Sequence, residues 1–241
     1  MNDCEAYFDL SRRIPDVRRV ADMIEVILDQ RWANQNRNTA LYYMYRDLGR
    51  TEDREKIIAH ALRYDITVIP PLIMGKEFVK TKGHYHPECA PSVTYPEIYE
   101  IQEGKAHFLL QRTTKGRVDD VVMVEAKKGD KVIVPPNYGH VTINPGRDTL
   151  QLANWVCRNF ASLYEEYTKK RGAAYYELSD GTLLPNPNYG ELPKIRRAKP
   201  TEVPELGIER GRALYSLIEN PEQLAFLIRP QNFMWVFERA F

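Results

Sequence analysis

The sequence predicts a mainly β fold, a double-sheet barrel of the jelly-roll type, and three observations support it. Between Asp65 and Trp155, short β-rich runs alternate with turn residues, which gives about eight strands at even spacing. Hydrophobic residues make up 43% and aromatic residues 11% of the 241 residues, which is enough for a packed core. Barrels of this kind often reach this length as one unit. We therefore expect one barrel with additional segments at both ends.

The segment before the barrel, residues 1–64, is expected to be helical and extended and to pack on the barrel. From Pro15 to Trp32, apolar residues recur at helical spacing, and Pro15 suits a first helical turn. In residues 51–63, a capping Thr51 precedes acidic residues and an apolar stripe, which predicts a second, short helix.

The barrel is expected over residues 65–175, and an irregular, partly helical extension over residues 176–241. Turns that contain proline or glycine separate the predicted strands. These strands are 66–69, 77–82, 98–101, 106–111, 118–125, 131–134, 140–143 and 149–156. In the extension, residues 179–181 predict a hairpin turn and Asn220 a helix start. The apolar residues after it are expected to cover the barrel or a second subunit.

Composition argues against several classes of partner. The 34 basic and 33 acidic residues give a net charge of +1, so no overall field favours nucleic acid or an acidic membrane. No apolar run approaches the roughly 20 residues that span a bilayer. The three cysteines are an odd number and widely spaced, and no signal peptide opens the chain. We expect a cytoplasmic protein with neither a nucleic-acid nor a membrane partner.

Four residues predict a mononuclear metal site. His84 and His86 are two positions apart on a predicted strand, so their side chains project from one face. Glu97 lies on the next strand and shares an inward face with Tyr99. His140 follows a turn rich in proline. Three imidazoles and one carboxylate leave open positions on a divalent ion such as Fe, Mn, Ni, Co or Zn, which predicts that substrate or water binds there.

Other polar side chains near this set leave alternatives open. Glu88 competes with Glu97 as the acidic ligand, although it lies next to a proline and close to His86. Cys89 is a further candidate, but a loop thiol without a paired cysteine is more often a bystander. His107 could act as a base behind the ligands or could be an ordinary strand histidine.

The spacing of these residues resembles the two motifs of the cupin family. The first motif is His-x-His, a Glu, and six residues later a Gly, and Glu97 is followed in this way by Gly104. The second is Gly-x5-Pro-x-Gly-x2-His-x3-Asn. Its matches are Gly129, Pro135, His140 and Asn144. The chain departs from these motifs in two ways. The gap between His86 and Glu97 is longer than usual, and Asn137 replaces a Gly. The second departure is mild because Asn tolerates positive φ.

Within the cupins, the chain resembles the archaeal-type, metal-dependent glucose-6-phosphate isomerases over roughly residues 15–190. The resemblance rests on residues 74–78, 81–86, 96–99 and 134–140 with Asn144. It implies interconversion of glucose 6-phosphate and fructose 6-phosphate, as in glycolysis and gluconeogenesis. It also implies one divalent ion per subunit, with iron as the first choice, in a homodimer.

The same resemblance implies residue roles. Glu97 would bind the metal and assist hydrogen transfer, while Tyr99 would orient Glu97 or the substrate. No Walker pattern is present to bind the phosphate. Its implied ligands are Tyr42, Thr67, Thr81 and Gly83. Trp155 stands where a Tyr is expected, and the His that relatives carry after the last barrel strand is missing, so another sugar phosphate could be the substrate.

Two other functions suit the same ligands, because ligand type alone does not separate reaction classes. One is an Fe(II) cupin dioxygenase, which would consume oxygen. The other is a non-catalytic sugar- or metal-binding cupin, which would bind its ligands without turnover.

Overall fold

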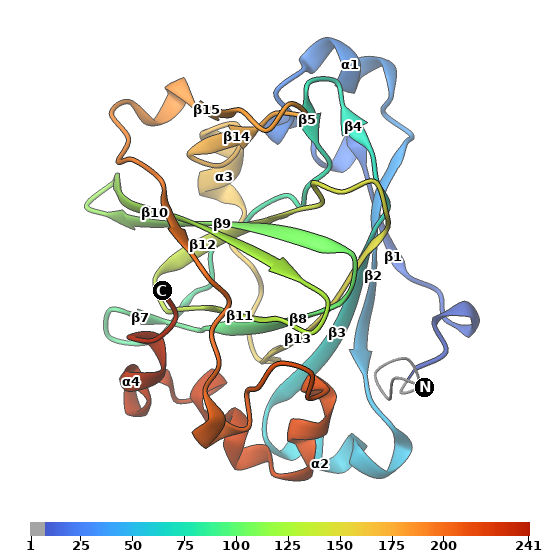
Figure 1. The fold of residues 1–241 in the computed structure, drawn as a ribbon, viewed down its shortest axis with the longest axis vertical. Coiled ribbons are helices and arrows are strands. Elements are labelled where there is room, and N and C mark those ends of the chain that lie inside the picture. Colours follow the sequence, from blue (N-terminus) through green and yellow to red (C-terminus); the bar gives the residue numbers. More distant parts are fainter. Residues whose placement is uncertain (1–7) are drawn as a thin grey trace.

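The computed structural model describes residues 8–241 and has two facing sheets, so the predicted double-sheet β fold is confirmed (Figure 1). The larger sheet is antiparallel throughout. In spatial order its strands are β1 (Asp16–Arg19), β2 (Ala40–Leu48), β3 (Leu62–Ile69), β13 (Leu150–Cys157), β8 (Glu97–Glu103) and β11 (Lys131–Val134). The smaller sheet consists of β12 (Tyr138–Ile143), β9 (Lys105–Thr114), β10 (Arg117–Lys127) and β16 (Arg196–Ala198).

Short hairpins and helical turns complete the chain. The hairpin pairs are β4 (Ile73–Met74) with β5 (Glu77–Phe78), β6 (Glu88–Ala90) with β7 (Val93–Thr94), and β14 (Tyr175–Glu177) with β15 (Leu183–Pro185). The α-helices are α1 (Gln30–Gln35), α2 (Arg54–Ala59), α3 (Glu165–Lys169) and α4 (Met234–Phe237). The 3-10 turns are η1 (Leu10–Arg12), η2 (Val20–Asp22), η3 (Ile24–Val26), η4 (Thr51–Asp53), η5 (Pro187–Tyr189), η6 (Pro204–Leu206), η7 (Leu214–Glu219), η8 (Pro221–Leu227) and η9 (Pro230–Asn232). None of these described helices is long and apolar enough to cross a membrane.

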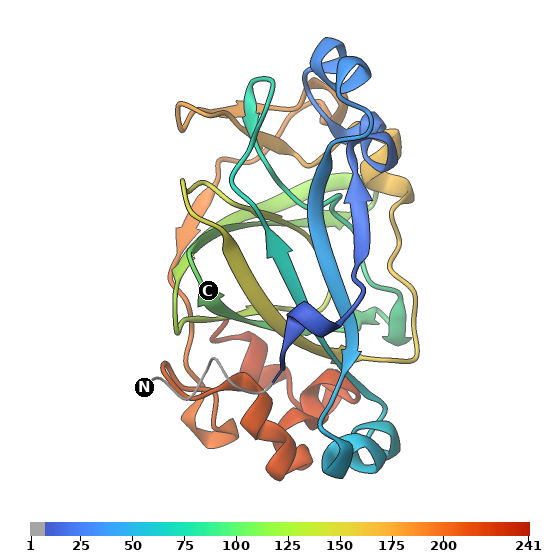
Figure 2. The same ribbon diagram turned by 90° about the vertical axis from the view of Figure 1, so that its right-hand side faces the viewer.

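The N-terminal segment differs most from its prediction. The helix expected from Pro15 to Trp32 is wrong: β1 pairs there with β2, followed by η2, η3 and the start of α1. Hydrogen bonds to β2 replace those that a helix would make within itself. Of the apolar residues that suggested helical spacing, Val20 and Ile27 are nevertheless buried. β2 was not predicted, and Figure 2 shows it beside β1 and β3 in the larger sheet. The second predicted helix is confirmed as η4 and α2.

Alternation along β3, β13 and β8 divides their side chains between two environments. Thr67, Asn154 and Tyr99 face the interior of the barrel and its pocket. Tyr64 and Trp155, which point the other way, belong to a second hydrophobic cluster. One face of these strands packs in the second hydrophobic cluster and the other lines the pocket, so the strands are apolar on one side and partly polar on the other.

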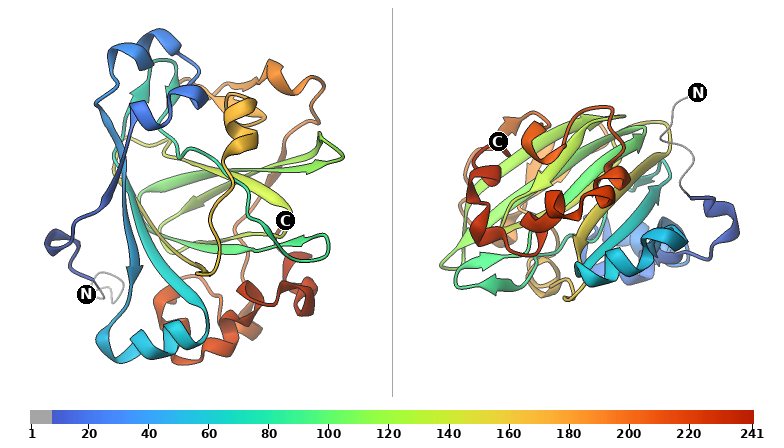
Figure 3. Two further views of the ribbon diagram at one scale, coloured as in Figure 1. Left: turned by 180° about the vertical axis from the view of Figure 1, so that it is seen from behind. Right: turned by 90° about the horizontal axis from the view of Figure 1, so that it is seen from below.

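The C-terminal extension covers the face of the larger sheet that points away from the pocket. Its turns lie together with α2 at one end of the molecule, across the end of the barrel when viewed from below (Figure 3). Phe226 and Phe237 are buried in the same cluster as Trp155. A buried ion pair secures this contact: Lys131 Nζ lies 2.9 Å from Glu100 Oε1, and the other Glu100 oxygen accepts from the backbone N–H of Leu214 at 2.9 Å. Of the two predicted alternatives, the apolar extension covers its own barrel.

Candidate metal centre

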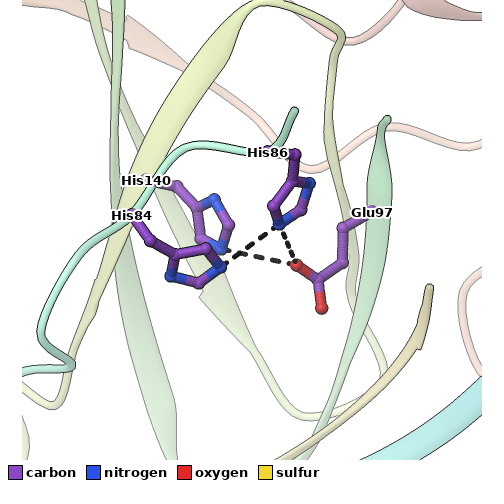
Figure 4. A group of neighbouring side chains, drawn as sticks. All are labelled: His84, His86, Glu97 and His140. Carbon is purple, nitrogen blue, oxygen red and sulfur yellow. Dashed lines mark hydrogen bonds and ion pairs between the residues drawn. The ribbon is translucent and has the colours of Figure 1, made fainter. Parts of the chain in front are cut away.

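Four side chains converge inside the barrel, as predicted from their spacing. His84, His86, Glu97 and His140 each offer one ligand atom, and these atoms all lie within 4.8 Å of one another. Figure 4 shows the three imidazoles turned toward one carboxylate oxygen. Glu97 Oε2 is 3.4 Å from Nε2 of His86 and 3.5 Å from Nε2 of His140. Three elements therefore deliver four converging donor atoms that could hold one metal ion.

His84 and His86 lie on an extended segment rather than on the regular strand that was predicted. Residues 81–86 form only isolated bridges, one of them between His84 and His140. The two-residue period nevertheless applies, because Tyr85 points away from the cluster and bonds to Thr113 with its hydroxyl. The segment with His84 and His86 thus keeps the geometry of a strand without its full ladder of hydrogen bonds.

The long gap between His86 and Glu97 contains the β6–β7 hairpin. This hairpin leaves the barrel and returns to place Glu97 at the start of β8. It is tied to the turn before β12 by three hydrogen bonds of Asn137: Thr94 N–H to Asn137 Oδ1 at 3.2 Å, Asn137 N–H to Thr94 Oγ1 at 2.6 Å, and Asn137 Nδ2 to the Ser92 carbonyl oxygen at 2.9 Å. Asn137 has a φ of 70°, so it adopts the conformation for which the family motif uses Gly. Both departures from the motif therefore have a local structural explanation.

The imidazoles are in the state that a metal requires. Nδ1 of His86 lies 2.8 Å from the Tyr95 carbonyl oxygen, which can only accept, so Nδ1 carries the proton and Nε2 offers its lone pair. Burial, with repulsion from the neighbouring histidines, lowers the pKa of His84 well below its ordinary value. Burial likewise lowers the pKa of His140 to about 4, although the Glu97 carboxylate opposes the shift. At neutral pH these two rings are uncharged.

Glu97 is fixed by partners on both of its oxygens. Asn154 donates its amide to Oε1 at 2.6 Å, while Oε2 faces the histidines. Burial alone would raise the pKa of Glu97, but its interactions with His86 first, and then with His140 and Tyr99, keep this pKa below its ordinary value. The hydroxyl of Tyr99 also lies 3.0 Å from His140 Nε2, and burial followed by the Glu97 charge raises the pKa of Tyr99 well above its ordinary value. Glu97 is thus a carboxylate beside a neutral phenol.

This donor set fits a divalent cation. Nε2 of His84 and Nε2 of His86 are 3.2 Å apart. The lone pair of His86 Nε2 points into the cluster, because the proton of this ring is on Nδ1. Two imidazole nitrogens and a carboxylate at such separations need a cation or a shared proton between them. The mixture of nitrogen and oxygen donors is compatible with Fe, Mn, Ni, Co and Zn and does not select among them.

Three of the four residues implied as phosphate ligands line the same pocket as the metal cluster. They are Tyr42, Thr67 and Thr81, and Lys82 lies beside them. The hydroxyl of Tyr42 accepts from the backbone N–H of Lys82 at 3.3 Å, and burial raises the pKa of Tyr42 to about 12. Gly83 does not line this pocket. Its φ of 77° turns the chain between Thr81 and His84, and a side chain there would collide with the ring of Tyr167.

Arg18 is a cation beside this group that the sequence did not reveal. It is the cross-strand partner of Tyr42 in the β1–β2 pair, and its charge partly offsets the rise in the Tyr42 pKa. Its Cζ lies 5.8 Å from the ring centroid of Tyr164, which also lines the pocket. Nε of Arg18 is buried without a hydrogen-bond partner, and within residues 8–241 Arg18 forms no ion pair with a carboxylate. In this part of the chain, its positive charge therefore has no carboxylate at ion-pair distance.

The alternative residues lie outside the cluster. Glu88 is exposed on the β6–β7 hairpin, and Cys89 contacts the carbonyl oxygen of Val93. His107 lies on the outer side of the smaller sheet with Nδ1 2.8 Å from Glu177 Oε1, so its interpretation as an ordinary strand histidine is correct and a role as base behind the ligands is not. Cys4, the third cysteine, lies outside the described residues.

The wall of the pocket next to Glu97 was the least predictable part. Trp155 points away from it and donates its indole N–H to the Leu214 carbonyl, so it cannot stand in for the expected Tyr. The wall is formed instead by side chains, most of them charged or polar, on inward positions of neighbouring strands and by a loop after β13. They are Arg46, Arg63, Asp65, Asn154, Val156, Phe160, Ser162 and Tyr164.

Comparison with known proteins agrees with the predicted resemblance. The family model described as glucose-6-phosphate isomerase (GPI) matches residues 17–194. Glucose-6-phosphate isomerase of Pyrococcus furiosus is 34% identical over 133 residues, which cover 54% of this chain and 63% of that protein. The enzyme of Thermococcus kodakarensis is 35% identical over 136 residues, which cover 55% of this chain and 64% of that protein. The matched part thus spans less than two thirds of each relative.

Among solved structures, a mutant of Bacillus subtilis oxalate decarboxylase aligns with a TM-score of 0.37 and 16% sequence identity, covering 52% of this chain and 28% of the other. The structure of the same decarboxylase at pH 4.6 aligns with a TM-score of 0.35 and 17% identity, covering 51% of this chain and 26% of the other.

Proposed function

The chain belongs to the cupin-type glucose-6-phosphate isomerase family, and from this premise we propose that it interconverts glucose 6-phosphate and fructose 6-phosphate in the pocket described above. One observation carries the proposal: the same pocket combines a cluster that could hold a divalent ion with hydroxyl groups, and Arg18, which forms no ion pair with a carboxylate among residues 8–241, lies beside the pocket as the cross-strand partner of Tyr42. An aldose–ketose isomerase that acts on a sugar phosphate needs both features in one cavity.

His84, His86, Glu97 and His140 are the proposed ligands of the metal. A divalent cation held there supplies Lewis acidity to the two oxygens that exchange carbonyl and hydroxyl character. Asn154 fixes one oxygen of Glu97, so the carboxylate has one defined orientation toward the pocket. Because its pKa is held below the ordinary value, Glu97 is ionised at neutral pH and can accept the hydrogen that moves between C1 and C2 as a proton. Tyr99 orients this carboxylate.

The phosphate is proposed to lie at the other end of the pocket. Tyr42, Thr67 and Thr81 offer hydroxyl groups there, and the hydroxyl of Thr81 remains free to donate because its oxygen accepts from the Thr142 N–H at 3.0 Å. Gly83 contributes by turning the chain rather than by lining the cavity. Arg18 supplies the charge, since a guanidinium that forms no ion pair with a carboxylate in residues 8–241 is a natural binding group for phosphate.

Iron as the resident ion, a homodimer and a cytoplasmic place in glycolysis and gluconeogenesis belong to the same proposal. β1 is an edge strand of the larger sheet, and this supports a dimer because an edge strand can pair with a strand of a second copy. Metal analysis and light scattering of the purified protein test the first two attributes.

The central experiment measures conversion of fructose 6-phosphate to glucose 6-phosphate after chelation and after addition of Fe, Mn, Ni, Co or Zn. Activity that disappears with the chelator and returns with a divalent ion is expected. His140→Gln should abolish it, whereas His107→Gln, a matched change on the neighbouring strand outside the pocket, should not. Absence of turnover with every metal would refute the proposal, and oxygen uptake without isomerisation would indicate a dioxygenase instead.

A further inference from the structure

Arg63 is held in one orientation by a buried carboxylate. Its Nε lies 2.9 Å and 3.1 Å from the two oxygens of Asp65, and its Nη2 lies 2.9 Å from Oδ2. Asp65 is itself fixed, because Oδ1 also accepts the Asp47 N–H at 2.8 Å and Arg46 lies 3.6 Å from Oδ2. A guanidinium bound along one edge cannot swing away, so its position is set before any ligand arrives.

The other edge of Arg63 is uncommitted and belongs to the pocket. No hydrogen bond or ion pair of Nη1 occurs in the part of the chain that the structure describes. The side chain is 26% exposed, and Arg63 lines the cavity that contains the metal cluster. Arg46, by contrast, has its Nε 3.2 Å from Asp16 and its Nη2 against the sulfur of Met44, so it supports Asp65 rather than offering donors.

Strand register places this free edge across a gap from Glu97. Val156 of β13 is the cross-strand partner of Arg63 on one side and of Glu97 on the other. Arg63 and Glu97 are thus two strands apart, roughly 10 Å between backbones, with only a short apolar side chain between them. A group that lies over Val156 has the carboxylate on one side and the guanidinium on the other. Burial opposes the charge of Arg63, but Asp65 and then Glu97 hold its pKa above the ordinary value.

We propose that Arg63, oriented by Asp65, donates a hydrogen bond from Nη1 to the oxygen at the reacting end of the substrate, where negative charge develops. The inference deepens the proposed function and rests on it. Glu97 and Arg63 then face the same C1–C2 unit from two sides, one removing a proton and the other stabilising the resulting oxyanion. Such a donor, preorganised by a buried carboxylate, is worth more than one that must be ordered during the reaction.

The test compares two ligands that share a phosphate and differ at C1. In 6-phosphogluconate C1 is a carboxylate, whereas in sorbitol 6-phosphate it bears an uncharged hydroxyl. Titration calorimetry on the protein loaded with one chosen divalent ion gives both affinities. Arg63→Gln should weaken 6-phosphogluconate by about 10-fold or more, as expected for a hydrogen bond between charged groups, and sorbitol 6-phosphate by much less. The change in the ratio of the two affinities between the wild-type protein and Arg63→Gln measures how much Arg63 contributes to binding the charge at C1.

Two further variants separate this role from a structural one. Arg158→Gln removes another Arg–Asp contact of the same region, that with Asp47 at 3.0 Å, outside the pocket, and should change neither affinity. Arg63→Lys keeps a positive charge beside Asp65 and guards against failure of Arg63→Gln to fold. Lysine lacks the second edge, so the affinity ratio should fall with this variant as well.

Kinetics provides a second readout. In Arg63→Gln, kcat should fall by about 100-fold, the usual effect of losing one oxyanion donor, while inhibition by inorganic phosphate stays unchanged. Equal weakening of both C1 ligands, or no change in either, would overturn the proposal. If the wild-type protein shows the ligand preference and Arg63→Gln loses it, but no isomerisation occurs, the proposed function fails while binding of an anion at C1 by Arg63 stands.

Discussion

Asn154 donates its side-chain amide to Oε1 of Glu97 at 2.6 Å, on the opposite side of the carboxylate from the histidines. This contact leaves Oε2 as the oxygen that faces the ligand cluster. Asn154 lies in β13 between β3 and β8, paired with Asp65 on one side and with Tyr99 on the other. Asn154 thus lies, in the strand register, between Asp65 of β3 and Tyr99 of β8.

Replacement of Asn154 by Leu should weaken metal binding by about 10- to 100-fold, as the loss of an outer-shell hydrogen bond typically does. The amide fixes the carboxylate orientation, which Leu of similar size cannot do. Calorimetric titration of the stripped protein with Mn²⁺ or Zn²⁺ measures the change. Gln151→Leu removes one side-chain hydrogen bond, to Gln102 at 2.9 Å, from the same strand and should leave metal affinity unaltered. Wild-type affinity in Asn154→Leu would contradict the assigned role.

Arg18→Gln should raise KM for fructose 6-phosphate by about 10- to 100-fold and change kcat little, because it removes a charge-assisted contact to a group that does not react. Inhibition by inorganic phosphate should weaken in parallel. Arg19→Gln is the matched control, since the neighbouring arginine is exposed and bonds to the carbonyl oxygen of Asn38 at 2.7 Å. An unchanged phosphate inhibition constant in Arg18→Gln would show that the phosphate lies elsewhere.

Lys131→Met should lower the free energy of unfolding by about 3 kcal/mol, because it removes the Lys131 cation from its buried ion pair with the Glu100 carboxylate. Both side chains of this pair are 1% exposed, and Glu100 also anchors Leu214 of the extension. Urea unfolding of the metal-free protein measures the loss. Lys105→Met, at an exposed position, should shift the midpoint little. Equal stability of the two variants would argue against the ion pair as the anchor of the extension.

Arg196→Ala should cost up to about 1 kcal/mol near pH 7 and less near pH 3. Arg196 binds both oxygens of Asp120, at 2.9 Å and 2.7 Å, and this holds the pKa of Asp120 below its ordinary value. A carboxylate with a lowered pKa stabilises the fold fully above its unfolded-state pKa and loses that contribution as pH falls through the folded-state value. Urea unfolding at both pH values tests this. The neighbouring Arg197, whose pair with Glu125 is exposed on both sides, should be neutral at either pH when changed to Ala.

The metal cluster could be predicted from the sequence because its signal is local. Two histidines at the period of an extended chain, and a Glu and a His at fixed distances from glycines, are visible without any tertiary structure. The barrel strands were predictable for the same reason, since each is a short run bounded by turn residues. The β6–β7 hairpin shows why even the unusual gap after His86 did not displace Glu97.

The remaining pocket residues could not be predicted because their positions depend on register between distant strands. Arg18 comes next to Tyr42 only through pairing of β1 with β2, and Asn154 comes next to Tyr99 only through pairing of β13 with β8. One local signal was available: in β3, charged Arg63 and Asp65 alternate with apolar residues. With an apolar outer face, such a pattern indicates a polar interior. The apolar spacing after Pro15 misled in the opposite direction, because short turns can bury the same residues as a helix.

Because β1 is an edge strand, the proposed phosphate-binding end of the pocket opens more easily than the metal-binding end. β1 has four residues and a single neighbour, whereas Glu97 of the metal cluster lies on β8, which is hydrogen-bonded to β13 on one side and to β11 on the other. Edge segments open locally at lower free energy than central strands. Fraying of β1 would withdraw Arg18 and let the phosphate go while the ion stayed in place. A doubly held sugar phosphate could thus depart in two steps, anion first, without any rearrangement of the barrel.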